Sequence, residues 1–409
     1  MSGGRGLNDL LRGLAPQVLA ALARRYGAFD AAEDAVQEAL ATAAAQWPRD
    51  GVPAQPRGWL ITVATRRLIE QFRSDAARRG RELRAWQLDR TPVEVADRDD
   101  TLRLLLLCCH RSLRRPARVA LTLRAVGGLT TAEIARAYLL PEATVAQRIS
   151  RAKRRIQDSG ARFDMPDAAE TADRLDAVMQ VLYLIFTEGS TVSAGATLNR
   201  VDLTTEAIRL TRQLVAALPG HGEAAGLLAL MLLTDARRPA RTTPDGDLVP
   251  LTEQDRTRWD QHAIAEGTAL VKNALATAPI GPYQLQAAIA AVHDEAGTAQ
   301  ATDWKQILVL YDLLGTIAPG PIATVNRAVA LAMVQGATAG LAALDTAVAA
   351  EPALAGYYRV DATRGYLLDL AGDHAAAREA YARAAAGTLS LPEQRHLRSR
   401  ADNSYLPPR

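Results

Sequence analysis

The chain has 409 residues, of which 48% are apolar, 23% charged and 5% aromatic, and its formal net charge is +3. This composition is typical of a soluble globular protein with room for two or three domains. No uncharged apolar stretch is long enough to span a bilayer, and residues 1–14 lack the apolar run and cleavage site of a signal peptide. The sequence therefore argues against a secreted or membrane-bound protein and predicts a cytoplasmic one.

The near-neutral total hides opposite charges in two parts of the chain. Residues 1–160 hold 27 Lys and Arg against 17 Asp and Glu, a net charge of +10, whereas the remainder carries a net charge of −7. A basic segment attracts phosphate polyanions and an acidic segment repels them. We expect any nucleic acid to bind residues 1–160; the alternative interpretation is a solvated basic surface.

Apolar residues recur at helical spacing along nearly the whole chain, so the sequence predicts an all-α fold. Stretches dense in Pro, Gly or charge break this pattern at 47–58, 74–100, 158–170 and 237–250. The breaks predict four parts, which are a first module at 1–73, a linker at 74–100, a second module at 101–158 and a helical C-terminal part at 170–409.

The first module contains two helices of different character. The helix predicted at 31–47 carries an acidic cluster at 33–38, and the helix predicted at 58–74 mixes aromatic residues with arginines. Aromatic rings can stack an unpaired base while arginines hold its phosphates; the alternative is that these rings belong to the core. The candidates for single-strand contact are Trp59, Thr62, Arg66, Arg67 and Arg73.

The second module carries the clearest pattern, at residues 127–156. Thr130 and Glu133 form a T-x-x-E capping box that opens a short helix, and Pro141 separates this helix from the next one. This spacing is typical of a helix-turn-helix motif. The adjacent cysteines in the same module, Cys108 and Cys109, make poor disulfide geometry, so we expect both to be buried and reduced.

The last helix of the second module has two distinct faces. Val145, Ile149, Ala152 and Ile156 recur at i, i+4, i+7 and i+11, which predicts a stripe facing the core. The residues off this stripe suit a recognition helix, because Arg and Gln pair with guanine and adenine edges and further arginines hold phosphates; the alternative is a solvated basic surface. These residues are Thr144, Gln147, Arg148, Arg151, Arg154 and Arg155.

Two imperfect repeats stand out in the C-terminal part. Gly336 and Gly372 are 36 positions apart and each follows a helical pattern, which approaches the ~34-residue period of tetratricopeptide (TPR) repeats. Stacked helical pairs bind peptides or proteins, so we expect a protein partner for this part. The alternative is a helical cap that only stabilises the rest of the chain.

Three motifs, in this order, resemble the extracytoplasmic-function (ECF) group of sigma-70 factors with its regions two and four. They are AEDAVQEAL at 32–40, PRGWL at 56–60 and the helix-turn-helix sequence at 127–156. The segments LRLLLLCCHRSL, YLIFTEGS and PYQLQAAIAAVHDEA further resemble the subgroup with a long TPR-like C-terminal extension. The segment YLIFTEGS departs from that subgroup at Thr187 and Ser190, and we interpret it as a buried helix end capped by Gly189.

The resemblance implies an alternative sigma factor that binds core RNA polymerase, recognises the minus-thirty-five and minus-ten elements of promoter DNA and assists melting. It implies that Asp34, Gln37 and Glu38 contact core polymerase. It also implies that the helix from Trp59 to Arg73 captures minus-ten bases and that the helix at 142–156 enters the minus-thirty-five major groove. We expect Gln147, Arg148 and Arg151 on base edges and Arg154 and Arg155 on phosphates.

Patterns of enzymatic chemistry are lacking. The six histidines are scattered, and neither a phosphate-binding P-loop nor a G-x-S-x-G elbow occurs in the sequence. We therefore expect no enzyme, no catalytic residue, no metal site and no cofactor. Two other functions stay open, a helix-turn-helix regulator that acts on duplex DNA without being a polymerase subunit, and a TPR-type interaction scaffold. The acidic cluster at 33–38 favours the sigma factor, because an operator-binding regulator does not need it.

Overall fold

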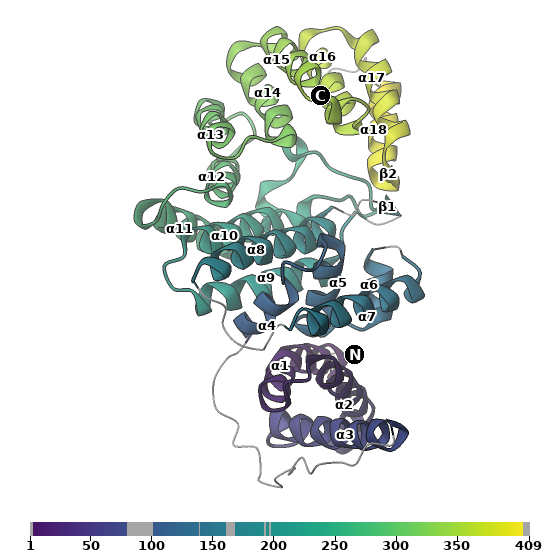
Figure 1. Ribbon diagram of the computed structural model, residues 1–409. Coiled ribbons are helices and arrows are strands. Elements are labelled where there is room, and N and C mark those ends of the chain that lie inside the picture. The colour runs from purple at the N-terminus through teal and green to yellow at the C-terminus, as the bar shows by residue number, and fades with distance from the viewer. Residues whose placement is uncertain are drawn as a thin grey trace. The chain divides into compact units, whose positions relative to one another are not determined.

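The computed structural model describes residues 3–79, 101–138, 140–160, 168–191, 194–195 and 198–403. The chain divides into two compact units, Met1–Leu184 and Ile185–Arg409. The predicted all-α class is confirmed, because helices account for nearly all regular structure in the described ranges (Figure 1). Among these helices, none combines the length and apolarity that a bilayer crossing requires.

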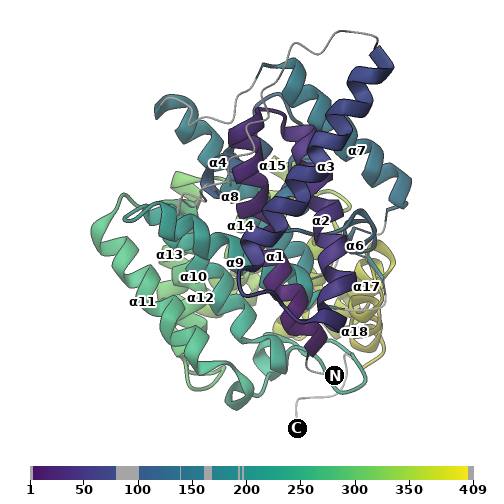
Figure 2. The same ribbon diagram turned by 90° about the horizontal axis from the view of Figure 1, so that it is seen from below.

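The first module consists of three helices that pack on one another, and it lies within unit 1. They are α1 (Gly3–Tyr26), α2 (Phe29–Asp50) and α3 (Pro56–Arg79) (Figure 2). Each helix contributes fully buried aliphatic side chains, which gives this module its own core. The core includes Val18, Leu22, Val36, Leu60 and Leu68.

The predicted loop at 47–58 is wrong at both ends. Helix α2 continues through Pro48 to Asp50, and α3 already begins at Pro56. Trp47 is buried and packs edge-on against Trp59, with 5.4 Å between ring centroids, so tertiary packing extends the helix past the point where the proline was expected to end it. Pro48 has no N–H to donate to the carbonyl of Ala44, so the last turn of α2 lacks one backbone hydrogen bond. The predicted linker at 74–100 overlaps the end of α3, and its residues 80–100 lie outside the described part.

The second module also lies in unit 1 and has four helices. Cys108 and Cys109 are buried in it as free thiols, as predicted, and burial raises the pKa of Cys108 well above its usual range and that of Cys109 to about 12. Helix α8 (Ala168–Ser190) follows this module. The four helices are α4 (Thr101–Cys108), α5 (Arg115–Ala125), α6 (Thr131–Ala137) and α7 (Glu142–Asp158).

Unit 2 is a succession of helices that mostly pack on their neighbours in sequence, and one of them, α12 (Pro282–Glu295), also packs extensively on α10 (Gly222–Ala236) (Figure 1). Its two short strands, β1 (Ala194–Gly195) and β2 (Leu389–Ser390), pair in parallel, with Ala194 opposite Leu389. The remaining elements include short 3₁₀ turns at Arg238–Ala240, Leu251–Glu253, Arg256–Arg258 and Pro352–Leu354. The α-helices are α9 (Val201–Ala217), α10 (Gly222–Ala236), α11 (Gln261–Thr277), α12 (Pro282–Glu295), α13 (Trp304–Ile317), α14 (Pro321–Gln335), α15 (Ala337–Ala350), α16 (Tyr358–Ala371), α17 (His374–Gly387) and α18 (Leu391–Asn403).

Glycines mark the turns of two helical hairpins in unit 2. Gly336 joins α14 to α15 with φ of +95°, and Gly372 joins α16 to α17 in the left-handed conformation with φ of +83°. The TPR-like pairs predicted around these glycines are present. Gly189 is a correction, because it lies inside α8 rather than after it. A Cβ there would lie 2.7 Å from the Thr204 backbone nitrogen, so this glycine serves the close approach of α9 instead of a helix cap.

Candidate nucleic-acid interface

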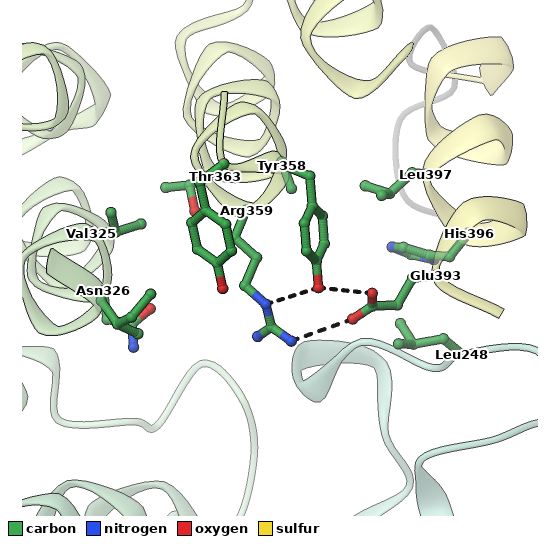
Figure 3. Close-up of a pocket in the computed structure, with 12 residues that line it drawn as sticks. Leu248, Val325, Asn326, Tyr358, Arg359, Thr363, Glu393, His396 and Leu397 are labelled. Atoms are coloured by element: carbon green, nitrogen blue, oxygen red, sulfur yellow. Dashed lines mark hydrogen bonds and ion pairs between the residues drawn. The ribbon is translucent and has the colours of Figure 1, made fainter. Parts of the chain in front are cut away.

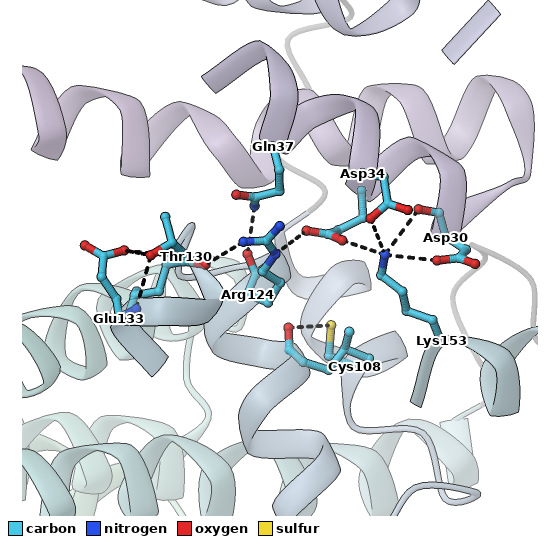
Figure 4. A network of polar contacts seen from close by, with 11 residues as sticks. Asp30, Asp34, Gln37, Cys108, Arg124, Thr130, Glu133 and Lys153 are labelled. Atoms are coloured by element: carbon cyan, nitrogen blue, oxygen red, sulfur yellow. Dashed lines mark hydrogen bonds and ion pairs between the residues drawn. The ribbon is translucent and has the colours of Figure 1, made fainter. Parts of the chain in front are cut away.

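The capping box at the start of α6 has the predicted geometry. The Thr130 backbone N–H donates to Glu133 Oε2 at 2.8 Å, and the Glu133 N–H donates to Thr130 Oγ1 at 3.2 Å (Figure 4). Glu133 Oε1 also accepts a bond of 3.0 Å from Arg12 of α1. Burial opposes the charge of this carboxylate, but the bonds from Thr130 and Arg12 prevail and lower the pKa of Glu133.

Helix α7 has the two faces that its sequence predicts. Val145, Ile149, Ala152 and Ile156 are each less than a tenth exposed and pack toward α5 and α6. The opposite face is open, with Arg148 half-buried and the other five candidates exposed. Within the described ranges, none of its arginines has a carboxylate at ion-pair distance. The face comprises Thr144, Gln147, Arg148, Arg151, Arg154 and Arg155.

Helix α3 presents a second set of basic side chains. Arg66 and Arg73 are exposed, and the described residues hold no carboxylate at ion-pair distance from either of them. Arg67 is exposed as well, but it pairs at 3.5 Å with both Glu70 and Glu38. Such exposed pairs are weak and salt-sensitive, so Arg67 can exchange them for a phosphate.

The other two α3 candidates occupy the start of the helix. Trp59 is half-buried, because one side of its ring packs edge-on against Trp47. Thr62 is exposed, and its hydroxyl donates to the Gly58 carbonyl at 2.9 Å. The Trp59 ring is therefore held in place by the core while part of it faces outward, which is a suitable arrangement for stacking a base.

The acidic side of α2 faces the second module. Asp34 Oδ1 lies 2.7 Å from Lys153 Nζ of α7, and the Gln37 side-chain amide donates to the Arg124 carbonyl of α5 at 3.3 Å (Figure 4). Glu38 points elsewhere, since it is exposed and pairs with Arg67. Two of the three residues predicted to contact polymerase are thus engaged within the chain itself.

Both modules match known protein families. Residues 10–79 match Sigma-70 region 2, residues 103–156 match Sigma-70, region 4, and residues 174–275 match a family of unknown function (DUF6596). An uncharacterized protein of Rhizobium meliloti (strain 1021), R00370, is 40% identical across 96% of this chain and 94% of its own length.

Two relatives from Mycobacterium tuberculosis (strain H37Rv) are similar to about a third of this chain. The probable ECF RNA polymerase sigma factor SigI is 33% identical over 33% of this chain, and the ECF RNA polymerase sigma factor SigJ is 33% identical over 38% of it. The matched stretches span about half of each relative, 49% and 53% respectively. This chain belongs to the ECF group of sigma-70 factors. It carries an additional helical C-terminal part, part of which is matched by the family of unknown function.

In this sigma factor, sequence reasoning did not single out Lys153, and it gave Glu33 only as part of the acidic cluster at 33–38 and not as a contact between the modules. Lys153 is only 5% exposed, and its ammonium group lies 2.7 Å from Glu33 Oε2 and 2.9 Å from Asp30 Oδ1. Glu33 is 1% exposed and also accepts a 2.8 Å bond from Arg124 Nε. The helical period carried a signal for both, because Lys153 is four residues after buried Ile149, and Glu33 three before buried Val36.

The C-terminal part of this sigma factor contains a cavity of about 260 Å³ between α14, α16 and α18, with Leu248 at one side (Figure 3). Its wall holds a polar chain, in which Arg359 Nε donates to the Tyr358 hydroxyl at 3.0 Å and this hydroxyl donates to Glu393 Oε2 at 2.9 Å. Burial raises the pKa of Tyr358 to about 12, so the phenol stays protonated. Val325 adds an apolar surface to the same cavity.

Proposed function

We propose that this ECF sigma factor binds core RNA polymerase, recognises the minus-thirty-five and minus-ten promoter elements and assists melting of the second. The observation that carries the proposal is the open basic face of α7, whose opposite face is anchored in the core of a helix-turn-helix. A helix held in this way can enter the major groove as a rigid element. Catalysis of RNA synthesis belongs to the polymerase.

The minus-thirty-five element is assigned to α7. Gln147, Arg148 and Arg151 read base edges, and Arg154 and Arg155 hold phosphates on either side. All five lie off the buried stripe, and the four arginines have no competing carboxylate within the described residues.

The minus-ten element is assigned to α3. Trp59 stacks an unpaired base while Thr62, Arg66, Arg67 and Arg73 hold the strand, which keeps the melted DNA open. The support is the position of Trp59, fixed on one side by Trp47, together with the exposure of the other four side chains.

Core polymerase is assigned to the acidic face of α2, with Asp34, Gln37 and Glu38 as contact residues. Carboxylates on this face suit a basic surface of the polymerase. The C-terminal part is assigned a protein partner, and its succession of helical pairs supports this assignment, because stacked helical pairs present surfaces that bind peptides or proteins.

The test is transcription by purified core polymerase on fragmented genomic DNA, with and without the full chain. We expect run-off transcripts that begin at defined positions only when the chain is present. Binding of duplex DNA without promoter-specific initiation would favour the helix-turn-helix regulator instead. Binding of neither DNA nor polymerase would favour the interaction scaffold.

Substitution of Arg148 or Arg151 by alanine sharpens the same test. Each lost base contact should weaken binding to the upstream element by about 1 to 3 kcal/mol, measured as transcription from promoters with matched and altered upstream sequences. An equal loss on every sequence would reassign these arginines to the phosphates. Glu142→Gln, at the start of α7, is the control that leaves every arginine in place.

A further inference from the structure

The cavity between α14, α16 and α18 is lined by charged, aromatic and apolar side chains that all belong to unit 2 (Figure 3). Its volume of about 260 Å³ corresponds to roughly nine water molecules, because each takes about 30 Å³ in the liquid. A single helical turn with its side chains fills about 400 Å³, given a diameter of about 10 Å and a pitch of about 5.4 Å. The cavity therefore suits a small organic molecule and not a helix of another protein.

Arg359, at the start of α16, is held in place on one side and open on the other. Its Nε donates to the Tyr358 hydroxyl at 3.0 Å, its guanidinium carbon lies 5.5 Å from the centre of the Tyr358 ring, and its Nη2 lies 3.5 Å from Glu393 Oε1. Burial opposes its charge, but Tyr358 and Glu393 outweigh burial and raise the pKa of Arg359. Among the described residues, none accepts a hydrogen bond from its Nη1. The cavity wall thus contains a fixed cation with one nitrogen available to a ligand.

Glu393, the acidic side chain of the same wall, is already neutralised by its neighbours. Its Oε2 accepts bonds from the Tyr358 hydroxyl at 2.9 Å and the Thr388 hydroxyl at 2.8 Å, and its Oε1 faces Arg359. Only 13% of the Glu393 side chain is exposed, against 48% of that of Arg359. His396 also lines the cavity and stays uncharged at neutral pH, because burial lowers its pKa. The accessible charge of the wall is therefore positive, which favours an anionic ligand.

The rest of the wall offers a hydroxyl group and apolar surface. Tyr357 packs edge-on against Tyr358, with 5.4 Å between the ring centroids, and its hydroxyl forms no hydrogen bond within the described part of the chain. Val325 of α14 and Leu397 of α18 are buried apolar residues on opposite sides of the cavity (Figure 3). Ligand sites commonly combine such apolar walls with a few polar groups that fix the orientation of the ligand.

We propose that this cavity binds a small organic carboxylate, whose charged end accepts hydrogen bonds from Arg359 and Tyr357 and whose apolar body contacts Val325 and Leu397. Hydrogen bonds between a guanidinium and a carboxylate are strengthened by both charges. Inorganic phosphate would pair with Arg359 but would leave the apolar walls without a contact. The inference does not depend on the proposed function, because none of these unit 2 residues is assigned to DNA or polymerase.

The experiment measures binding of benzoate, which matches the size of the cavity, to the full-length chain by ligand-observed NMR at constant ionic strength. Benzamide has nearly the same shape without the charge, and inorganic phosphate has the charge without the apolar body. We expect saturable binding of benzoate at one site per chain. Benzamide and phosphate should each bind at least about tenfold more weakly, because each lacks one of the two kinds of contact.

Two substitutions test whether benzoate occupies this cavity. Arg359→Gln removes the cation, and Asn326→Trp places a large ring at the cavity wall from an exposed position on α14. Each should weaken benzoate binding about tenfold or more. Arg383→Gln is the matched control and should leave binding unchanged. Arg383 of α17 is also about half exposed and bonded to one carboxylate, that of Asp361, but it does not line the cavity.

All variants are first checked by circular dichroism for the helix content of the parent chain. Absence of saturable benzoate binding to the parent chain would overturn the inference. Equal binding of benzamide would do the same, because the Arg359 charge would then contribute nothing, and equal binding of phosphate would remove the role of the apolar walls. Benzoate binding that is unchanged in folded Arg359→Gln and Asn326→Trp would place the ligand outside this cavity and also contradict the inference.

Discussion

In unit 1 charged side chains from distant parts of the sequence link the two modules, whereas in unit 2 the helices from α13 to α18 pack mainly on their neighbours in the sequence. The unit 1 contact centres on Lys153 and Glu33, both buried. In unit 2, Gly340 of α15 lets Ala332 of α14 approach closely, and Gly365 of α16 does the same for Tyr381. A charged contact can be displaced by another charged surface, but close packing of small residues offers no such exchange. The comparison predicts that the charged contact of unit 1 is easier to displace than the close-packed helix contacts of unit 2.

The largest effect is expected from loss of the buried cation in unit 1. Lys153→Met should lower the free energy of unfolding by about 3 kcal/mol, the lower end of the cost of breaking a buried ion pair, because buried Glu33 loses its ammonium partner but keeps Arg124. Urea denaturation followed by circular dichroism measures this change. Arg115→Met removes an exposed cation and should stay within about 0.5 kcal/mol of the parent. A loss below about 1 kcal/mol in Lys153→Met would mean that charge does not hold unit 1 together.

Adding a methyl group at a close helix contact tests whether tight packing holds unit 2 together. A Cβ at position 340 would lie 2.5 Å from the Ala332 Cβ and 2.8 Å from the Ala328 carbonyl oxygen. Gly340→Ala should therefore lower the free energy of unfolding by about 1 to 3 kcal/mol. Gly315 of α13 has nothing within 4 Å of the same position, so Gly315→Ala should stabilise by up to about 1 kcal/mol through helix propensity. Thermal unfolding of both variants tests the opposite signs, and equal signs would contradict the close-packing account.

A third prediction concerns the stability of unit 2 at acid pH. Burial, together with Arg237 and Arg256, lowers the pKa of His293 to about 3, well below its ordinary value. Below about pH 6.5 the His293 imidazole is protonated in the unfolded chain but stays neutral in the folded chain. The free energy of unfolding therefore falls as the pH drops from about 6.5 toward 3. This histidine should remove about 2 kcal/mol between pH 7 and pH 5.

The contribution of His293 is isolated by comparing denaturation at these two pH values in the parent chain and in His293→Gln. The difference between the two pH values should shrink by about that amount in the variant. His262→Gln changes an exposed histidine and is the control. If the pH dependence is the same in all three chains, His293 does not make unit 2 sensitive to acid.

Local patterns predicted much of the fold. The capping box of Thr130 and Glu133, the buried stripe of α7 and the hairpin glycines at 336 and 372 depend on residues close in sequence, and the structure has them where they were expected. The ends of α2 and α3 were wrong, because packing of Trp47 on Trp59 carries α2 beyond Pro48. Gly189 was wrong for a similar reason, since its neighbour is Thr204 on another helix.

The candidate site was predictable only in part. The outward face of α7 follows from its helical period, but the assignment of α2 to a partner protein took no account of a partner inside the chain. Lys153 has arginines as neighbours in the sequence, and this pattern predicts another exposed cation. Only the fold brings its ammonium group within 3 Å of Asp30, Glu33 and Asp34. Spacing in the sequence does not encode such a meeting of helices more than 100 residues apart.

The adjacent thiols at the end of α4 allow the opening of the second module to be measured directly. Cys108 and Cys109 are the two cysteines of the whole chain, both are buried, and their raised pKa values keep them in the unreactive thiol form. A thiol-specific reagent should therefore label the native chain only as fast as the second module opens internally. Labelling rates, read by mass spectrometry, would time that local opening with no substitution at all.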